Sequence, residues 1–441
     1  MSTKKVSVFG LGKLGATMVG CFASKGCEVI GVDIDAAMVE QVGKHKSPVP
    51  EPGLQELYDA HKGSISATQD VRAAVHGSDI SFIIVPTPSM PDGEFFTTIA
   101  SDVARAIGEA LVDKSDYHLI VLTSTVLPGA TNRDVRRALE EGSNKACGID
   151  FGLCYSPEFI AIGNVIRGLL QPDFFLIGEY DQRSGDLLED LYRQIGGTDV
   201  EVVRMNIENA ELTKIAINTF VTTKISFANT LSRICSMMAG GDAHVVSYAV
   251  GLDKRIGQPY MKPGPAYGGP CFPRDNRAFA WFARSVGAEA PLAMATEAIN
   301  RHQIDFLIQE VIANIVPDAV IGLLGLSYKP DTHVVDESQS IDMARRFIGR
   351  NHTVLAYDPW VCQYGLPEAM EGLTLCDTVD ECIQNSDMIV IATPHDEFAA
   401  LTPDDLCRNG QSLPVVDVWG MLRARGFASL PNYSVPGVNR R

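Results

Sequence analysis

Residues 5–35 read KVSVFGLGKLGATMVGCFASKGCEVIGVDID, and this stretch decides the fold of the first part of the chain. An apolar run at 5–9 has the composition of a short β-strand and ends in a glycine-rich turn. A helix-compatible apolar pattern follows, and a second β-run at 28–35 ends in acidic residues. Strand, helix and strand in this order predict a βαβ unit with parallel strands.

The glycines of this turn match the GxGxxG dinucleotide fingerprint at Gly10, Gly12 and Gly15. They permit a tight turn and let a pyrophosphate approach the N–H groups and dipole of the following helix. Asp33, at the end of the second strand, would accept hydrogen bonds from ribose hydroxyls and repel a 2′-phosphate. The sequence therefore predicts an NAD site.

Further strand-like segments lie at 79–89, 117–126 and 151–159, with helix-compatible stretches between them. This alternation predicts a parallel sheet covered on both faces. Residues 206–239 then form one long helical pattern that is apolar around most of its circumference and contains no proline or glycine. Such a helix must be buried on most faces, so we expect it to join two domains or two subunits.

After residue 317 the α/β pattern returns, with strand-like segments that each end in a polar turn. We therefore predict an α/β fold class with two Rossmann-like doubly wound domains joined by a central long helix in a helical dimerisation region. The predicted boundaries are 1–203 for the NAD-binding domain, 204–302 for the central domain and 303–441 for a C-terminal nucleotide-sugar-binding domain.

Composition narrows the functional classes. A net charge of −17 and a pI near 5.0 argue against nucleic-acid binding, which needs a basic face. The ten cysteines show neither metal-ligand spacing nor a disulfide framework, so we expect no metal and reduced thiols. The chain starts directly with a strand-like segment and has no apolar run near the ~20 residues of a membrane helix. We expect a cytoplasmic protein without a membrane or nucleic-acid partner.

Cys271 lies in PGPAYGGPCFPRDN, residues 263–276, a segment of turn formers. A lone cysteine is usually a small apolar packing residue. Here the glycine pair Gly268 and Gly269 gives access, while Arg274 stands beside Asp275 and supplies a cation that favours a thiolate. A reactive thiol is the alternative that these neighbours favour.

Other polar residues follow the predicted strands and the long helix. Thr87, Thr125 and Glu158 each follow a strand, where open α/β sheets bind their ligands. Lys214 and Asn218 are four residues apart and share one face of the helix. A single lysine at such a position normally keeps its ammonium in water, and single polar residues after strands are normally turn formers or caps.

Eight motifs in order resemble the UDP-glucose/GDP-mannose dehydrogenase family across essentially the whole chain: GLGKLG, PTP, STV, SPEF, ENAELTKIAINTF, GLDKRIG, PGPAYGGPCFPRD and GLSYKPDT. The resemblance implies an NAD-dependent oxidation of a nucleotide-sugar C6 alcohol to a carboxylate, with two NAD and one water. UDP-glucose is the substrate it favours, with a UDP-N-acetylhexosamine or GDP-mannose as alternatives. It also implies a homodimer or a higher homo-oligomer.

The resemblance also implies roles for individual residues. Cys271 matches the family's nucleophile, and Lys214 and Asn218 would hold the reacting oxygen. Thr125 and Asp275 would position a proton-relaying water, and Glu158 would help to activate the water for thioester hydrolysis. The implied cofactor-binding residues are Gly10, Gly12, Leu14, Gly15, Asp33, Pro86, Thr87, Thr125 and Arg274. The implied substrate-binding residues are Glu158, Phe159, Ile160, Lys214, Asn218, Arg255 (acting on a neighbouring subunit's substrate), Tyr260 (near the base), Lys262, Gly268, Phe272 and Lys329.

Three positions depart from the family pattern: Ile162 where many members have Glu, and Asp336 and Trp419 where they have Arg. The last two remove positive charges expected near the cofactor phosphates and the nucleotide sugar. Two further hypotheses remain open. One is a two-electron β-hydroxyacid-type dehydrogenase, which would leave Cys271 and the second sheet unexplained, and the other is a non-catalytic nucleotide-sugar-binding module.

Overall fold

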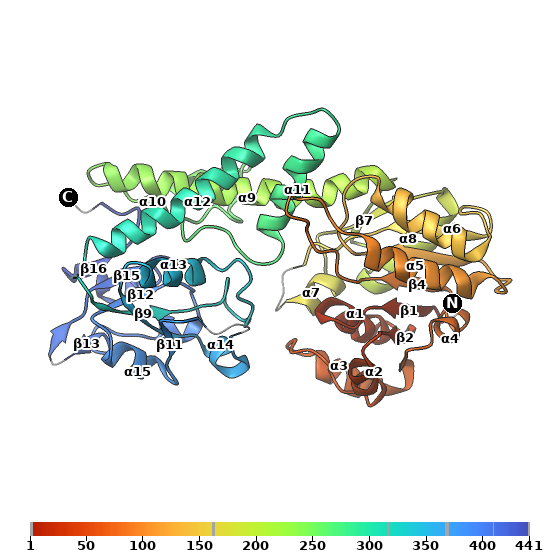
Figure 1. The fold of residues 1–441 in the computed structure, drawn as a ribbon, viewed down its shortest axis with the longest axis horizontal. Helices are drawn as coiled ribbons and strands as arrows, with labels where there is room; N and C mark the ends of the chain where they lie inside the picture. Colours follow the sequence, from red (N-terminus) through yellow and green to blue (C-terminus); the bar gives the residue numbers. More distant parts are fainter. Residues whose placement is uncertain (1–2, 161–163, 316, 367–369, 409, 440–441) are drawn as a thin grey trace. The chain divides into compact units, whose positions relative to one another are not determined.

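The computed structural model describes residues 3–160, 164–315, 317–366, 370–408 and 410–439 (Figure 1). The chain forms two compact units, residues 1–216 and 217–441. The expected α/β class is confirmed, because each unit contains its own largely parallel sheet with helices on both faces. The division into three domains at 203 and 302 stays a prediction.

The first unit is built on an eight-stranded sheet of order β3-β2-β1-β4-β5-β6-β7-β8. All neighbouring pairs are parallel except β6 and β7. The strands are β1 Lys5–Phe9, β2 Glu28–Val32, β3 Ile65–Thr68, β4 Ile80–Ile83, β5 His118–Leu122, β6 Phe151–Tyr155, β7 Phe174–Glu179 and β8 Glu201–Asn206.

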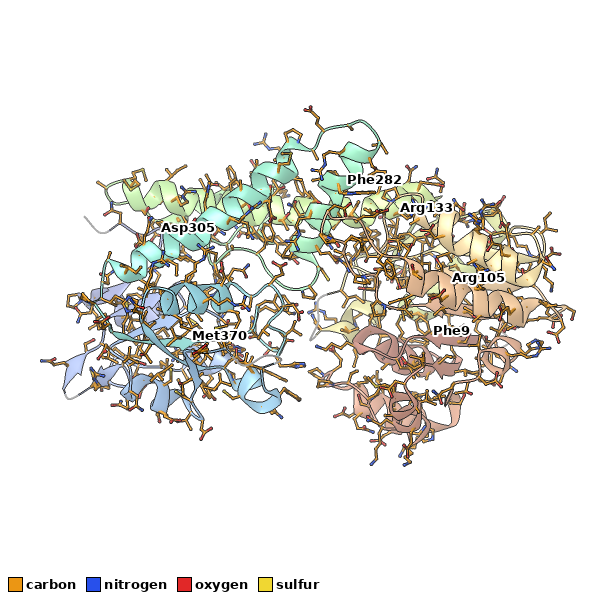
Figure 2. The ribbon with its side chains drawn as sticks, viewed as in Figure 1. Phe9, Arg105, Arg133, Phe282, Asp305 and Met370 are labelled. Atoms are coloured by element: carbon orange, nitrogen blue, oxygen red, sulfur yellow. The ribbon has the colours of Figure 1, made fainter. Side chains whose placement is uncertain are left out.

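Two sets of helices cover this sheet. One face carries α1 (Lys13–Ser24), α3 (Leu54–Ala60), α7 (Val165–Leu170) and α8 (Gln182–Gly196). The other carries α4 (Val71–His76), α5 (Thr98–Leu111) and α6 (Arg137–Ser143). Helices α5 and α6 lie side by side (Figure 1), and Arg105, labelled in Figure 2, pairs with Glu141 across them at 2.9 Å. The short α2 (Ala36–Gly43) follows β2.

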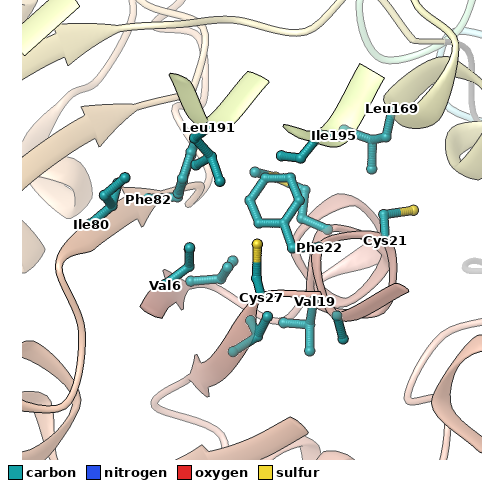
Figure 3. Packing of buried hydrophobic residues seen from close by; sticks show 14 of the residues in the cluster. Val6, Val19, Cys21, Phe22, Cys27, Ile80, Phe82, Leu169, Leu191 and Ile195 are labelled. Carbon is teal, nitrogen blue, oxygen red and sulfur yellow. The ribbon is translucent and has the colours of Figure 1, made fainter. Parts of the chain in front are cut away.

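The core of this unit follows from strand alternation, which sends successive side chains to opposite faces. Val6 and Val8 of β1 belong to the core under α1 and α8, whereas Phe9 belongs to the core on the other face. Figure 3 shows Phe22 of α1 among these residues, and its ring meets Phe82 edge-on with centroids 5.2 Å apart. This packing holds α1, and with it the glycine-rich turn, against the sheet.

The second unit contains most of α9 (Ile207–Met237) together with α10 (Ala243–Leu252), α11 (Phe272–Ser285) and α12 (Pro291–Ile312). Its six-stranded sheet is all parallel, in the order β11-β10-β9-β12-β15-β16. The strands are β9 Val320–Leu324, β10 Thr353–Tyr357, β11 Leu373–Leu375, β12 Met388–Ile391, β15 Val415–Asp417 and β16 Tyr433–Ser434. Helices α13 (Gln339–Ile348) and α15 (Val379–Gln384) pack on opposite faces of this sheet (Figure 1).

Helix α9 confirms the long helix expected at 206–239 within two residues at each end. Its burial is less complete than its composition suggests. Phe220, Phe227 and Ile234 recur every seven residues and are 50–63% exposed in the single chain. Side chains seven apart share one face of a helix, so these three form an exposed apolar stripe.

A polar network also crosses the core of the first sheet. Lys114 is buried and donates to the Val75 carbonyl and to Nδ1 of His118, at 2.6 and 3.0 Å. His118 Nε2 lies 2.7 Å from the Ser81 hydroxyl, which in turn lies 2.7 Å from that of Ser7. Burial, followed by the Lys114 charge, lowers the pKa of His118 to about 3. The imidazole therefore stays neutral in the folded protein at neutral pH.

Candidate active site

The glycine-rich turn has the geometry that its fingerprint predicts. Gly10 has φ +103°, and a Cβ there would overlap the Ile84 carbonyl oxygen. A Cβ on Gly15 would overlap the carbonyl oxygen of Gly10, so this glycine lets α1 approach β1. Nothing lies within 4 Å of a Cβ at Gly12, which leaves open space beside the start of α1. A pyrophosphate needs this access to the helix N-terminus.

Asp33 closes the same turn from the second strand. Its Oδ2 accepts from the Leu11 N–H at 2.6 Å and its Oδ1 accepts from the Asp35 N–H at 2.9 Å. Each carboxylate oxygen has a second lone pair for a ribose hydroxyl. The next side chain, Ile34, is 94% exposed and offers an apolar surface beside this carboxylate. Sequence reasoning did not single out Ile34.

The polar residues after β4 and β5 are brought together. The Thr87 hydroxyl donates to the Thr125 carbonyl at 2.7 Å. The Ser124 hydroxyl accepts from the Val85 N–H and donates to the Val85 carbonyl, at 2.8 and 2.7 Å. These contacts join the PTP and STV segments at the carboxyl ends of neighbouring parallel strands. Pro86 lies within the same junction.

Lys214 is only 7% exposed, contrary to the general expectation that a single lysine reaches water. Its Nζ donates to the Glu158 carbonyl and lies 5.0 Å from the centre of the Phe159 ring. The Glu158 carboxylate accepts from the Ile160 N–H at 2.9 Å. Glu158, Phe159 and Ile160 also line a cavity of about 250 Å³. The SPEF segment therefore surrounds the buried ammonium of Lys214 within the first unit.

In the second unit, Cys271 is exposed and immediately precedes α11. One turn later Asp275 is fully buried, and its N–H donates to the Cys271 carbonyl at 2.8 Å. Its carboxylate accepts from Asn218 Nδ2 at 2.6 Å and pairs with Arg274 at 2.9 Å. A buried carboxylate needs such partners. The structure thus brings Asn218 of α9 together with Arg274 and Asp275, which lie on the helical turn that follows the thiol.

The glycine-rich segment before Cys271 is held by amides that sequence reasoning missed. Asn229 Oδ1 accepts from the Gly264 N–H at 3.0 Å, and Gln303 donates to the Gly264 carbonyl at 2.9 Å. Asn300 accepts from the Tyr267 N–H at 2.7 Å. The available signal was the presence of amide side chains on otherwise apolar helical faces of α9 and α12.

The remaining predicted substrate residues of the second unit have varied surroundings. Arg255 is largely exposed and pairs with Asp253 at 2.6 Å. Tyr260 has φ +66° and meets Phe272 edge-on at 6.1 Å. Lys329 lies 5.9 Å from the centre of the Tyr328 ring. A Cβ on Gly268 would overlap the Glu337 carbonyl oxygen, so only glycine fits there.

The positions that depart from the family pattern also have defined surroundings. The Trp419 indole donates to the Ala392 carbonyl at 2.8 Å, and Lys262 lies 5.6 Å from its ring centre. Asp336 lines a cavity of about 700 Å³ in the second unit. The arginines that line the same cavity are Arg277, Arg301, Arg345 and Arg346. Ile162 lies outside the described residues.

In the second sheet an acidic residue also follows the second strand, but its hydrogen-bond partners differ from those of Asp33. Asp358 follows β10 as Asp33 follows β2. Its Oδ2 accepts from the Ser327 N–H, the Ser327 hydroxyl and His395 Nε2, at 2.9, 2.8 and 3.0 Å. Burial is the largest single influence and raises its pKa, but His395 and the backbone N–H groups of Ser327 and Val361 together hold the pKa well below its usual range. Because the buried Asp358 carboxylate already accepts these hydrogen bonds from within the protein, it is not placed to bind a ribose.

Comparisons with known proteins agree with this architecture. Models of the UDP-glucose/GDP-mannose dehydrogenase family match its NAD-binding domain at residues 4–196, its central domain at 208–302 and its UDP-binding domain at 322–424. The chain belongs to the UDP-glucose/GDP-mannose dehydrogenase family. It is therefore an NAD-dependent nucleotide-sugar dehydrogenase, as its sequence motifs predicted.

Three relatives illustrate the range of similarity. GDP-mannose 6-dehydrogenase of Pseudomonas putida is 35% identical over 414 residues, covering 90% of this chain and 92% of the relative. A UDP-glucose 6-dehydrogenase of Haloferax volcanii is 33% identical over 401 residues, covering 90% and 93%. The structure of a UDP-glucose dehydrogenase from Pyrobaculum islandicum matches with a TM-score of 0.89 at 31% identity, covering 98% of this chain and 97% of that one.

Family membership gives no support to the β-hydroxyacid-type alternative or to a purely binding role. Among the residues that the structure describes, no helix is long and apolar enough to cross a bilayer. Within the same ranges, no group of three His, Cys, Asp or Glu side chains is arranged to hold a metal ion.

Proposed function

We propose that this dehydrogenase oxidises UDP-glucose to UDP-glucuronate through a covalent intermediate on Cys271. The observation that carries the proposal is the exposed thiol one helical turn from the buried Asp275 carboxylate, which is held by Asn218 and Arg274. The balanced reaction converts the C6 alcohol, two NAD⁺ and one water to the carboxylate, two NADH and three protons. NAD supplies the hydride acceptor in each of the two oxidations.

The thiol solves a problem that the reaction creates. The first oxidation yields an aldehyde, which would otherwise diffuse away. Addition of the Cys271 sulfur to C6 gives a thiohemiacetal, and the second oxidation converts it to a thioester. Water then attacks the thioester carbonyl, the C–S bond breaks, and the thiol is regenerated as the acid leaves. The sulfur must therefore reach the same sugar carbon that loses hydride.

The neighbouring residues have roles that suit this sequence. Negative charge develops on the C6 oxygen at each addition and collapse, and the Lys214 ammonium and the Asn218 amide would stabilise it. We assign a water-positioning role to Thr125 and Asp275 and a water-activating role to Glu158. The contact of Lys214 with the Glu158 carbonyl supports joint action of these two residues.

The choice of nucleotide sugar rests on similarity. The Haloferax and Pyrobaculum relatives act on UDP-glucose by name, whereas the Pseudomonas relative acts on GDP-mannose, so GDP-mannose is the second candidate. Lys262, Lys329 and Arg255 are the cations we assign to substrate phosphates and sugar. Trp419 stands at the position of the family's usual arginine, and the Lys262 ammonium lies 5.6 Å from its ring centre.

A substrate panel with measured stoichiometry tests this proposal. The purified protein would receive NAD with UDP-glucose, GDP-mannose, UDP-N-acetylglucosamine or UDP-N-acetylmannosamine. We expect UDP-glucose to give the highest kcat/KM and two NADH for each sugar acid formed. One NADH per product with accumulation of free aldehyde would contradict the four-electron reaction, and preference for another sugar would overturn only the choice of substrate.

The NAD assignment of Asp33 leads to a second prediction. In Asp33→Ser the carboxylate that would bind the ribose hydroxyls is lost, and so is its repulsion of a 2′-phosphate. We expect KM for NAD to rise about 10- to 100-fold, with a smaller change for NADP. Asp35→Ser is the matched control, because Asp35 only caps α2 through the Ala37 N–H and serine is also a good cap. Equal KM values for NAD in wild type and Asp33→Ser would contradict the assignment.

The exposed stripe of Phe220, Phe227 and Ile234 supports a further part of the proposal, assembly as a homodimer. A large exposed apolar patch on a single chain marks an interaction surface. A second copy of α9 presents the same stripe, so a two-fold arrangement would bury both. Within such a dimer we assign Arg255 to the substrate of the neighbouring subunit.

A further inference from the structure

Glu211 is a buried carboxylate that no step of the proposed reaction uses. It lies on the first turns of α9, three residues before Lys214, and is fully buried. An ionisable side chain in the core is rare unless it has a specific partner. Here its partners are backbone N–H groups from a different segment of the same unit.

Both oxygens of Glu211 bind the segment after the STV motif. Oε2 accepts from the Gly129 N–H at 2.5 Å and Oε1 accepts from the Thr131 N–H at 2.8 Å. Gly129 has φ +89°, so the chain turns sharply there before the helical segment that starts at Thr131. A carboxylate is well suited to this position, because the N–H groups at a helix start have no partner within the helix.

The same loop is fixed at its other end. Ser124 is bonded to Val85, and the Thr125 carbonyl accepts from Thr87. Thr125 therefore lies between one anchor on the segment that follows β4 and a second anchor on Glu211. Because Glu211 and Lys214 are three apart on α9, they lie on the same side of the helix. Lys214 in turn binds the Glu158 carbonyl.

We propose that Glu211 is a positioning residue. Its ionised carboxylate fixes the loop of residues 123–130, here called the Thr125 loop, to the helical turn that carries Lys214. The proposal rests on the proposed roles of Thr125 and Lys214. When Glu211 is protonated, one oxygen becomes a donor and faces a backbone N–H, so one of the two anchoring bonds is lost. Catalysis by Thr125 and Lys214 then slows because their spacing loosens.

The electrostatic surroundings of Glu211 place its protonation near neutral pH. Burial raises the pKa of Glu211 to about 7, although the hydrogen bonds from Thr131 and Gly129 lower it. The charged groups that face it are Glu208 on its own helix, which raises the pKa further, and Arg133 on the facing segment. Arg133 is labelled in Figure 2.

The raised pKa of Glu211 determines how its ionisation changes the stability of the folded protein. A carboxyl whose pKa is higher in the folded state than in the unfolded chain loses stability as pH rises from its ordinary value of 4.5 to about 7. Ionisation of Glu211 thus opposes folding. A residue kept only for stability would not show this behaviour.

Glu211→Gln tests the proposal, with Glu208→Gln as the matched control. Glutamine resembles the protonated acid, so we expect kcat at pH 8 to fall about 10- to 100-fold with KM values changed less than about threefold. The ratio of wild-type to Glu211→Gln kcat should fall about tenfold between pH 8 and pH 6, as the wild-type carboxylate protonates. The Tm of Glu211→Gln at pH 8 should not be lower than that of the wild type.

The control and a third variant separate the possible failures. Glu208 accepts from Asn132 Nδ2 at 2.7 Å, and the amide oxygen of a glutamine would keep that acceptor, so Glu208→Gln should keep kcat within about twofold. A lower Tm together with a pH-independent kcat ratio in Glu211→Gln would show a purely structural role and overturn the proposal. Full activity of Lys214→Met would instead overturn the proposed function, whatever Glu211→Gln does.

Discussion

Replacing Cys271 by alanine is expected to abolish sugar-acid formation, with kcat reduced at least about a thousandfold. Without the sulfur, the aldehyde has no covalent tether, and the second oxidation has no thiohemiacetal to act on. NAD binding should be unaffected, because the glycine-rich turn and Asp33 belong to the other unit. The measurements are NADH formation, chromatographic detection of the uronate, and NAD affinity by fluorescence titration.

A second cysteine of the same unit provides the control. Cys407 is half-buried, and its thiol contacts the Pro403 carbonyl at 3.3 Å. Cys407→Ala should therefore retain kcat within about twofold. A further observation makes the test specific: brief mixing of wild-type enzyme with substrate and NAD should give a mass increase on the peptide that contains Cys271. Near-normal turnover by Cys271→Ala would favour a mechanism without a covalent intermediate.

The second large effect is expected for Lys214→Met. Methionine keeps an unbranched apolar stem against Phe159 but removes the only charge that this side chain offers to the reacting oxygen. Loss of one donor at a developing oxyanion typically costs about 3 kcal/mol, or about a hundredfold in rate. Because Lys214 is buried and bound to Glu158, loss of both its charge and this anchor should bring the fall in kcat to about a thousandfold.

Steady-state kinetics across a pH series provide the readout for Lys214→Met. The matched control is Thr213→Ala, because the Thr213 hydroxyl donates at 2.7 Å to the Asn209 carbonyl of its own helix and lies 3.7 Å from Met205 Sδ, and neither partner is a predicted site residue. Thr213→Ala should keep kcat within about twofold. A rise in KM with unchanged kcat in Lys214→Met would show that Lys214 only binds the substrate, which would remove it from the chemical step.

Much of the fold was predictable because its signals are local. The fingerprint glycines appear next to an apolar strand, and their steric needs are those that the structure shows at Gly10 and Gly15. The length of α9 was also predictable, since helix periodicity continues without a breaker over 206–239. Cys271 was noticed because glycines and an Arg-Asp pair surround it in sequence.

The environment of the site residues was less predictable. Burial of Lys214 depends on the Glu158 carbonyl, 56 positions away in the chain. The bond between Asn218 and Asp275 spans 57 positions, and the bonds of Glu211 span 80 or more. No periodicity or composition reports such pairs, because a side chain's burial is set by segments that fold onto it.

Asp33 and Asp358 show the division most directly. From sequence alone, each is an acidic residue at the end of an apolar strand. The sequence by itself also determines the two α/β sheets, the NAD fingerprint and the family motifs. Only the tertiary structure decides that Asp358 accepts hydrogen bonds from Ser327 and His395, while Asp33 keeps acceptor capacity for a ligand. The physical reason is that backbone preference is encoded locally, whereas the hydrogen-bonding partners of a buried charge come from distant strands.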